Sequence, residues 1–186
     1  MKLYIVRHGQ TDWNINGIIQ GQTDTQLNTT GVEQANLLRN KFNELDINLI
    51  MCSPLKRAKK TAEIINQDKN LRIIYRDELT ERGLGEYEGK DCEIERDEIY
   101  NYYKNDKKMN IEPVVDMCNR VNKLLEDIKE NYSNNKILLV THSGTARAIE
   151  AYFYGIDSNR RFAAREFRKL WNKKIWVIGS NNNYDI

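Results

Sequence analysis

The stretch Leu3-Tyr4-Ile5-Val6-Arg7-His8-Gly9-Gln10-Thr11 decides how the rest of the chain is interpreted. It opens with an apolar run that predicts a short buried strand. A cation, an imidazole and a glycine follow at once, which is an unusual end for a strand in a core. In an open α/β sheet, ligands bind at the carboxyl ends of the strands. The stretch therefore predicts a strand that carries an Arg-His pair into a ligand site.

Further apolar runs predict the remaining strands, at 47–51, 72–75, 137–140 and 175–178. They are nearly continuous in apolar residues, as expected when helices cover both faces of a sheet. Apolar residues spaced by three and four predict amphipathic helices over 32–45, 55–65 and 114–128. Strands that alternate with helices predict an α/β fold, a three-layer sandwich with a mostly parallel central sheet and helices on both faces.

The organisation of the chain is that of one unit. A length of 186 residues fits one ordinary domain, and no composition shift marks a linker. We therefore expect a single domain over residues 1–186. The charged, tyrosine-rich stretch 86–112 is too long for a simple loop and predicts a cap-like excursion over one end of the sheet.

Composition narrows the class of protein. Hydrophobic content of 40% and charged content of 30% are typical of a soluble globular protein, and the net charge of +2 gives no case for binding nucleic acid or a membrane. The three cysteines have no metal-ligand spacing. No apolar run has membrane-spanning length, and Arg7 and His8 interrupt any signal-like segment. We expect a cytoplasmic protein.

Charged and imidazole side chains follow the four predicted strands that alternate with helices. Arg7 and His8 follow the first strand, Arg57 the second, Glu81 the third and His142 the fourth. One histidine at a strand end is more often structural, but the only two histidines of the chain both stand there. Because the carboxyl ends of parallel strands lie at one edge of a sheet, we expect these five side chains to meet.

These residue types suit phosphoryl transfer, whose transition state spreads negative charge over the phosphate oxygens. Arg7 and Arg57 can bind those oxygens as permanently charged donors, and His142 adds a donor if it is protonated. His8 can attack phosphorus through a neutral ring nitrogen. Glu81 can protonate the leaving alkoxide and then activate water. The chemistry requires no metal ion and no other cofactor.

Four ordered blocks of sequence resemble a known family. The blocks are 3–14 with its continuation through 20–21 to 34–35, then 53–63, 79–89 and 140–147. In them the chain resembles the histidine phosphatase superfamily, the phosphoglycerate mutase-like fold. The resemblance implies a mostly parallel sheet flanked by helices, with one antiparallel edge strand.

The resemblance also implies roles for single residues. It implies a phosphohistidine at His8, with the other four strand-end side chains in the roles given above. The substrate-binding residues that it implies are Asn14, Gln20, Gly21 and Ser143. Arg82 is a further candidate because it neighbours Glu81, although a surface ion pair would explain it equally well.

Phosphatase and mutase activities share this site, and the sequence favours the phosphatase. Mutases that resemble this chain usually carry a long insertion between the catalytic glutamate and the second histidine, and here the segment 81–142 is short. Gln20 stands where mutases commonly have threonine, whereas Glu81-Arg82 and Gly85 match the mutase version. A phospho-ligand binder without activity is the remaining alternative, disfavoured because no catalytic side chain is missing.

The expected partner is a small phosphorylated metabolite, whose identity the sequence leaves open together with the oligomeric state. The basic run between residues 160 and 174 could steer anions toward the protein. A solvated helix face is the favoured interpretation of that run.

Overall fold

The computed structural model describes residues 1–91, 110–154, 175–179 and 184–185. The predicted excursion at 86–112 falls within this part of the chain only at its two ends, and the basic run at 160–174 lies outside the described residues. Among the described residues, no helix is long and apolar enough to cross a membrane.

A sheet with the order β3-β2-β4-β1-β5-β6 forms the centre of the structure. Its parallel part consists of β1 (Lys2–Arg7), β2 (Leu49–Cys52), β3 (Ile73–Tyr75) and β4 (Lys136–Thr141). The predicted α/β fold with a mostly parallel sheet is therefore confirmed.

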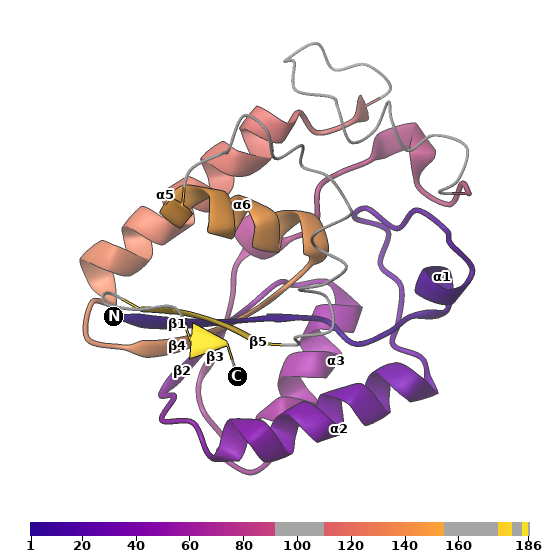
Figure 1. Ribbon diagram of the computed structural model, residues 1–186. Helices are drawn as coiled ribbons and strands as arrows, with labels where there is room; N and C mark the ends of the chain where they lie inside the picture. The colour runs from indigo at the N-terminus through magenta and orange to yellow at the C-terminus, as the bar shows by residue number, and fades with distance from the viewer. Residues whose placement is uncertain (92–109, 155–174, 180–183, 186) are drawn as a thin grey trace.

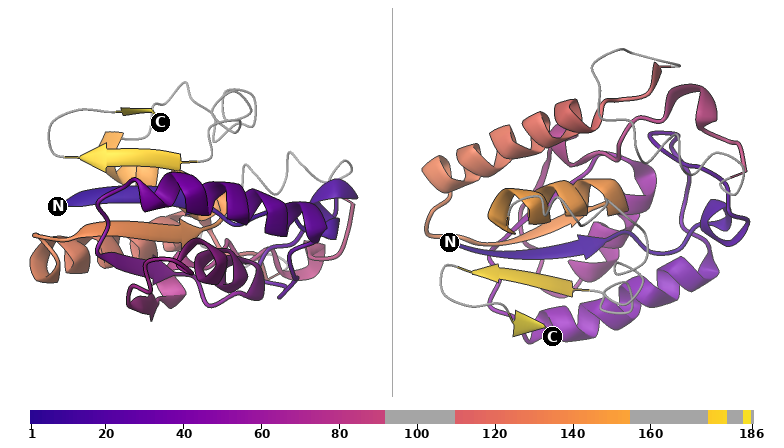
Figure 2. Two further views of the ribbon diagram at one scale, coloured as in Figure 1. Left: turned by 90° about the horizontal axis from the view of Figure 1, so that it is seen from below. Right: turned by 45° about the horizontal axis from the view of Figure 1, so that its top comes forward.

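Beyond β1 the direction of the strands changes. β5 (Ile175–Gly179) pairs antiparallel with β1, and the short β6 (Tyr184–Asp185) pairs antiparallel with β5. The opposite directions of β1, in indigo, and β5, in yellow, can be followed in the right view of Figure 2. The expected antiparallel edge strand is thus not found among the described residues: β5 runs against the parallel strands, but the edge beyond it is β6, which has the direction of β1 again.

Helices cover both faces of the sheet (Figure 1). α2 (Thr29–Asn43) and α3 (Lys56–Ile65) lie on one face, and α5 (Val114–Asn131) and α6 (Ser143–Tyr154) lie on the other. Alternate side chains of β1 serve the two layers, because successive residues of a strand point to opposite faces. Leu3 and Ile5 pack with α5 and α6, whereas Tyr4 and Val6 pack with α2 and α3.

The long helices follow from a cap and from apolar spacing. The Asn28 side chain accepts the N–H of Gly31 at 2.8 Å and so caps the start of α2. α5 instead carries a continuous apolar stripe, and the buried residues on it are Val114, Met117, Val121, Leu124, Leu125 and Ile128. Three short helical turns complete the described elements: α1 (Asp12–Ile15), η1 (Asp77–Leu79) and η2 (Gly85–Tyr87).

The register of the parallel strands brings their carboxyl ends to one level. Arg7 at the end of β1 lies opposite Thr141 at the end of β4, and Cys52 at the end of β2 lies opposite Val140. The pairing continues one residue further, because the N–H of His8 donates to the carbonyl of Thr141 at 3.0 Å. The segments that leave these strands therefore start side by side.

We expect Leu38→Ala to lower the free energy of unfolding by about 2–5 kcal/mol, because the substitution leaves a cavity between α2 and the sheet. Leu38 is 4% exposed. Leu37, its neighbour on the same helix, is 61% exposed, and Leu37→Ala should change stability by less than about 0.5 kcal/mol. Urea unfolding of both variants measures the difference, and equal losses would contradict the assigned face of α2.

Candidate active site

His8 follows β1 directly, and its ring is held by the backbone. Its Nδ1 lies 2.7 Å from the carbonyl oxygen of Gly9. A carbonyl oxygen can only accept, so Nδ1 carries the proton and Nε2 keeps its lone pair. The N–H of Gly9 donates to the Thr61 hydroxyl on α3 at 3.0 Å. The residue after the imidazole is thus fixed through both its N–H and its carbonyl.

Glycine at position 9 allows this segment to approach the start of α2. A Cβ on Gly9 would lie 2.4 Å from the carbonyl oxygen of Gly31. Any side chain here would push the loop after β1 away from α2, and the carbonyl that holds His8 would move with it. The glycine after the Arg-His pair is therefore a steric requirement.

His142 lies beside His8 and is completely buried. The centroids of the two rings are 5.0 Å apart. Nε2 of His142 is 2.8 Å from the hydroxyl of Ser53, which follows β2. Nδ1 of His142 is buried and has no hydrogen-bond partner within the described residues. Its second ring nitrogen is thus the one left for a ligand.

Both rings are neutral at physiological pH. Burial lowers the pKa of His8 well below its ordinary value of 6.5, and the charges of Arg7 and Arg57 lower it further, against the opposing effect of the Gly9 carbonyl. The pKa of His142 is also well below 6.5, mainly because the ring is buried, and the neighbouring His8 and the same two arginines lower it further. A neutral His8 fits the expected nucleophile. His142 can then donate only through the single N–H of a neutral ring.

Arg57 is fully buried, and its terminal nitrogens hold a loop. They donate to the carbonyl oxygens of Gly21 and Thr23, both at 2.7 Å, and one of them lies 3.4 Å from the Thr25 hydroxyl. Burial lowers the pKa of Arg57 from its ordinary value, and the charge of Glu81 opposes this effect most strongly. A guanidinium nevertheless stays charged. The structure thus places the predicted Arg57 and Gly21 in direct contact.

The carboxylate of Glu88 fixes that loop from the other side. It accepts the N–H groups of Gln22, Thr23 and Leu84 at 2.8–2.9 Å and the Thr23 hydroxyl at 2.6 Å. Sequence reasoning assigned no role to Glu88. Its partners are mostly backbone amides of two loops, which leave no signal in the sequence.

Glu81 lies against the start of α6, the helix that directly follows His142. Its two oxygens are 3.0 and 3.2 Å from the N–H of Gly144, and one of them also accepts the N–H of Arg82 at 2.9 Å. A Cβ on Gly144 would lie only 2.6 Å from a carboxylate oxygen of Glu81. The glycine after Ser143 therefore makes room for this carboxylate.

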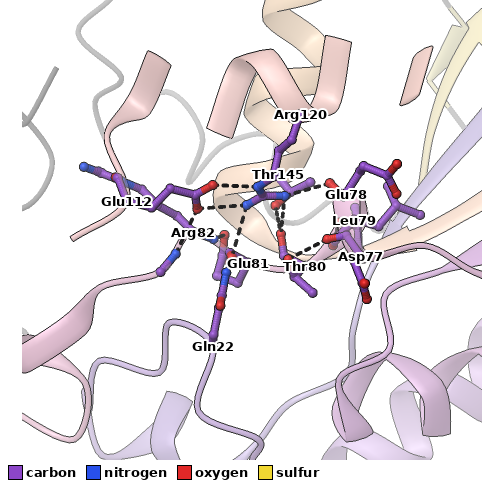
Figure 3. Close-up of polar contacts among 12 residues, drawn as sticks. Gln22, Asp77, Glu78, Leu79, Thr80, Glu81, Arg82, Glu112, Arg120 and Thr145 are labelled. Carbon is purple, nitrogen blue, oxygen red and sulfur yellow. Dashed lines mark hydrogen bonds and ion pairs between the residues drawn. The ribbon is translucent and has the colours of Figure 1, made fainter. Parts of the chain in front are cut away.

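An ion pair behind Glu81 holds the backbone that carries it (Figure 3). The guanidinium of Arg120 on α5 binds both oxygens of Glu112, at 2.6 and 3.0 Å. It also donates to the carbonyl oxygens of Glu78, Thr80 and Glu81, at 2.7–3.2 Å. Arg120 thus ties the backbone of Glu81 to α5 and to Glu112, just before that helix.

Arg82 is buried. A surface ion pair, the alternative explanation for this residue, is therefore not what the structure shows. Its Nε donates to the carbonyl oxygen of Glu112 at 2.7 Å. Gly83 donates its N–H to the Glu112 carboxylate at 3.0 Å. The segment after Glu81 is therefore fastened to Glu112 at two points.

The remaining predicted substrate residues make local contacts. The side-chain oxygen of Asn14 accepts the N–H and the hydroxyl of Thr11, both at 3.1 Å, and so completes a capping box on α1. The side-chain oxygen of Gln20 accepts the Thr25 hydroxyl at 2.6 Å. Ser143 is the first residue of α6. Gln20 thus joins the loop that Arg57 holds, whereas the contacts of Asn14 stay within the turn after β1.

Within the residues that the structure describes, no group of three or more histidine, cysteine, aspartate or glutamate side chains is arranged to hold a metal ion. The expectation of a reaction without a metal stays a prediction.

A mostly parallel sheet with two neutral imidazoles, buried arginines and a carboxylate at its carboxyl edge defines the class of enzymes that act on phosphate esters. The family model of the histidine phosphatase superfamily (branch 1) matches residues 3–166, and the chain belongs to this family. The prediction of the family is confirmed, and with it the class of enzyme, a phosphoric monoester hydrolase.

The relatives and solved structures that resemble this chain carry the names of phosphatases and of a mutase. The uncharacterized phosphatase PhoE of Bacillus subtilis is 38% identical over 155 residues, which cover 82% of this chain and 77% of the relative. The probable phosphoglycerate mutase GpmB of Escherichia coli O1:K1 is 29% identical, over 96% of this chain and 91% of the relative. A mycobacterial glucosyl-3-phosphoglycerate phosphatase, solved with VO3, superposes with a TM-score of 0.76 at 25% identity, covering 87% of this chain and 85% of that one.

We expect the free energy of unfolding to fall as the pH decreases from 7.5 to 5.5. In the folded chain the pKa values of His8 and His142 lie well below 6.5, whereas both rings take up a proton near 6.5 in the unfolded chain. In this window the unfolded chain binds more protons, so stability is lost as the pH falls. Urea unfolding at the two pH values measures the loss. His8→Asn removes one of the two groups and should show a smaller loss. An equal loss would contradict the assignment.

Proposed function

We propose that the protein hydrolyses small phosphomonoesters through a phosphohistidine on His8, with Glu81 as general acid and base. The observation that carries the proposal is the contact of His8 Nδ1 with the Gly9 carbonyl at 2.7 Å. This contact leaves the lone pair of Nε2 for attack, and the neutral state of the buried ring keeps that lone pair free of a proton.

The reaction takes two displacements at phosphorus. In the first, Nε2 of His8 forms a bond to phosphorus and the ester P–O bond breaks, and Glu81 gives its proton to the leaving alkoxide. In the second, Glu81 takes a proton from water, the water oxygen bonds to phosphorus and the P–N bond breaks. Inorganic phosphate leaves, and His8 and Glu81 return to their starting states. Glu81 thus acts as an acid in the first step and, once deprotonated, as the base in the second step.

Positive charge and polar hydrogens stabilise the transferring phosphoryl group in this proposal. Arg7, Arg57 and His142 bind its non-bridging oxygens, which carry the developing charge. The residues that we propose to contact the rest of the substrate or its phosphate are Asn14, Gln20, Gly21, Arg82 and Ser143. The contact of Arg57 with Gly21 and the place of Ser143 at the start of α6 support this set.

Hydrolysis is favoured over a phosphoglycerate mutase-type transfer. A relative named as a probable phosphoglycerate mutase is 29% identical to this chain, so the likeness to relatives does not by itself decide between the two activities. The segment from Glu81 to His142 is short, and it lacks the long insertion that mutases resembling this chain usually carry. A binder without activity is disfavoured because no catalytic side chain is missing, and Glu81 accepts the N–H of Gly144, two residues after His142.

We also propose that the chain is a single domain that acts in the cytoplasm on a small phosphorylated metabolite, without a cofactor or nucleic acid. The free thiols of Cys52 and Cys118 support a reducing compartment. Burial raises the pKa of the Cys52 thiol, so that this thiol is inert.

We expect turnover of small phosphomonoesters to persist in excess chelator and His8→Ala to abolish it, because the nucleophile is a side chain. Rapid quenching with a ³²P-labelled substrate should trap a phosphoenzyme that is labile in acid and stable in base. Loss of activity in chelator would overturn the mechanism. A panel of phosphorylated metabolites in the same buffer measures substrate preference. Faster phosphorylation of a monophosphoglycerate by a bisphosphoglycerate than hydrolysis of either would support the mutase instead.

Glu81→Gln should separate the two steps according to the leaving group. With p-nitrophenyl phosphate, whose leaving group needs no proton, the first step proceeds and the phosphoenzyme accumulates, because the side-chain amide of the variant cannot activate water. With an alkyl phosphate the first step slows too, by about 10²–10⁴-fold. Stopped-flow absorbance shows the burst and quenching measures the intermediate. Equal slowing with both substrates, without accumulation, would exclude Glu81 as the base.

A further inference from the structure

Ser53 is a buried residue of the site to which no role has been assigned. It follows β2, its side chain is fully buried, and its N–H donates to the carbonyl of Val140 at 3.0 Å. This backbone contact brings its hydroxyl to 2.8 Å from Nε2 of His142. The hydroxyl also accepts the N–H of Leu55 at 3.3 Å. Ser53 therefore stands between the start of α3 and the second histidine.

The neutral ring of His142 has two possible tautomers, and Ser53 distinguishes them. If the proton is on Nε2, the ring donates to the Ser53 oxygen. The proton of the Ser53 hydroxyl then has no acceptor among the described residues, and Nδ1 is a buried lone pair without a donor. If the proton is on Nδ1, the Ser53 hydroxyl donates to Nε2 and accepts from Leu55, and only the Nδ1 proton lacks a partner. The second arrangement leaves fewer buried polar groups unsatisfied, which favours it.

We propose that Ser53 is a positioning residue whose hydroxyl donates to Nε2 of His142 and keeps the ring proton on Nδ1, where it can donate to a bound phosphate oxygen. The proposal rests on the proposed function for the use of that proton, whereas the tautomer itself is a property of the free enzyme. Burial and the neighbouring cations, which hold the ring neutral, make the tautomer decisive. A charged ring would donate from both nitrogens whatever Ser53 did.

The two histidines then share one tautomer and use it in opposite ways. In His8 the Nδ1 proton is turned to the Gly9 carbonyl, and the lone pair of Nε2 is left for the substrate. In His142 the lone pair of Nε2 is turned to Ser53, and the Nδ1 proton is left for the substrate. A backbone acceptor beside one ring and a hydroxyl donor beside the other thus separate a nucleophile from a hydrogen-bond donor.

The chain has only two histidines, which makes the tautomers directly measurable. We expect long-range ¹⁵N–¹H spectra of ¹⁵N-histidine-labelled protein, without a histidine tag, to give the Nδ1–H tautomer for both rings at pH 7.5. In Ser53→Ala the His142 signals should move toward the Nε2–H tautomer, while those of His8 stay unchanged. His8→Ala assigns the two sets. An Nε2–H or charged His142 in the unaltered protein, or an unchanged His142 in Ser53→Ala, would overturn the proposal.

Phosphate binding provides the second measurement. In Ser53→Ala, loss of the donor at Nδ1 should weaken the binding of inorganic phosphate, measured by titration at pH 7.5. It should also lower kcat/KM by about tenfold, which corresponds to the loss of one hydrogen bond. Ser53→Thr keeps a hydroxyl and should restore the Nδ1–H signal and most of the activity wherever it folds. Lost activity in Ser53→Ala with the original His142 tautomer would mean a purely structural role and overturn the proposal. Active His8→Ala would refute the proposed function alone, because the tautomer measurement in free enzyme does not depend on it.

Discussion

The site depends first on the parallel register of β1 and β4, in which Arg7 lies opposite Thr141. Each of these residues is followed by a histidine, and the hydrogen bond from the His8 N–H to the Thr141 carbonyl carries the pairing beyond the strands. A shift of one residue would turn one side chain to the opposite face of the sheet. The 5.0 Å separation of the two rings is therefore a consequence of strand pairing in the core.

A second constraint is that the positive charge of Arg57 is buried beside the two histidine rings and needs hydrogen-bond acceptors there. Arg57 is buried, and the carbonyl oxygens of Gly21 and Thr23 accept its hydrogen bonds. The loop that supplies them is held in turn by the carboxylate of Glu88. Within the described part of the chain no carboxylate forms an ion pair with this guanidinium, so its positive charge acts on both imidazole rings and is available to a ligand.

Periodicity and strand ends predicted the fold and the meeting of His8 and His142, because the carboxyl ends of parallel strands must share an edge. The same reasoning placed Glu81, which the structure brings to the start of α6. It could not find Glu88 or Ser53, since their partners are backbone groups and a ring nitrogen supplied by distant segments. Arg82 is a similar case. Its position next to Glu81 in the sequence does not predict that its side chain is buried against Glu112. Hydrogen bonds between distant segments leave no repeating pattern in the sequence from which they could be predicted.

The contact between Glu81 and position 144 couples two sites that lie far apart in the chain. A methyl group at 144 would occupy the space of a carboxylate oxygen, 2.6 Å away. A side chain at 144 would therefore require the end of the Glu81 side chain to turn aside from its present contact with the N–H of residue 144. The residue at 144 thus acts on the orientation of the acid, although 63 positions of the chain separate the two.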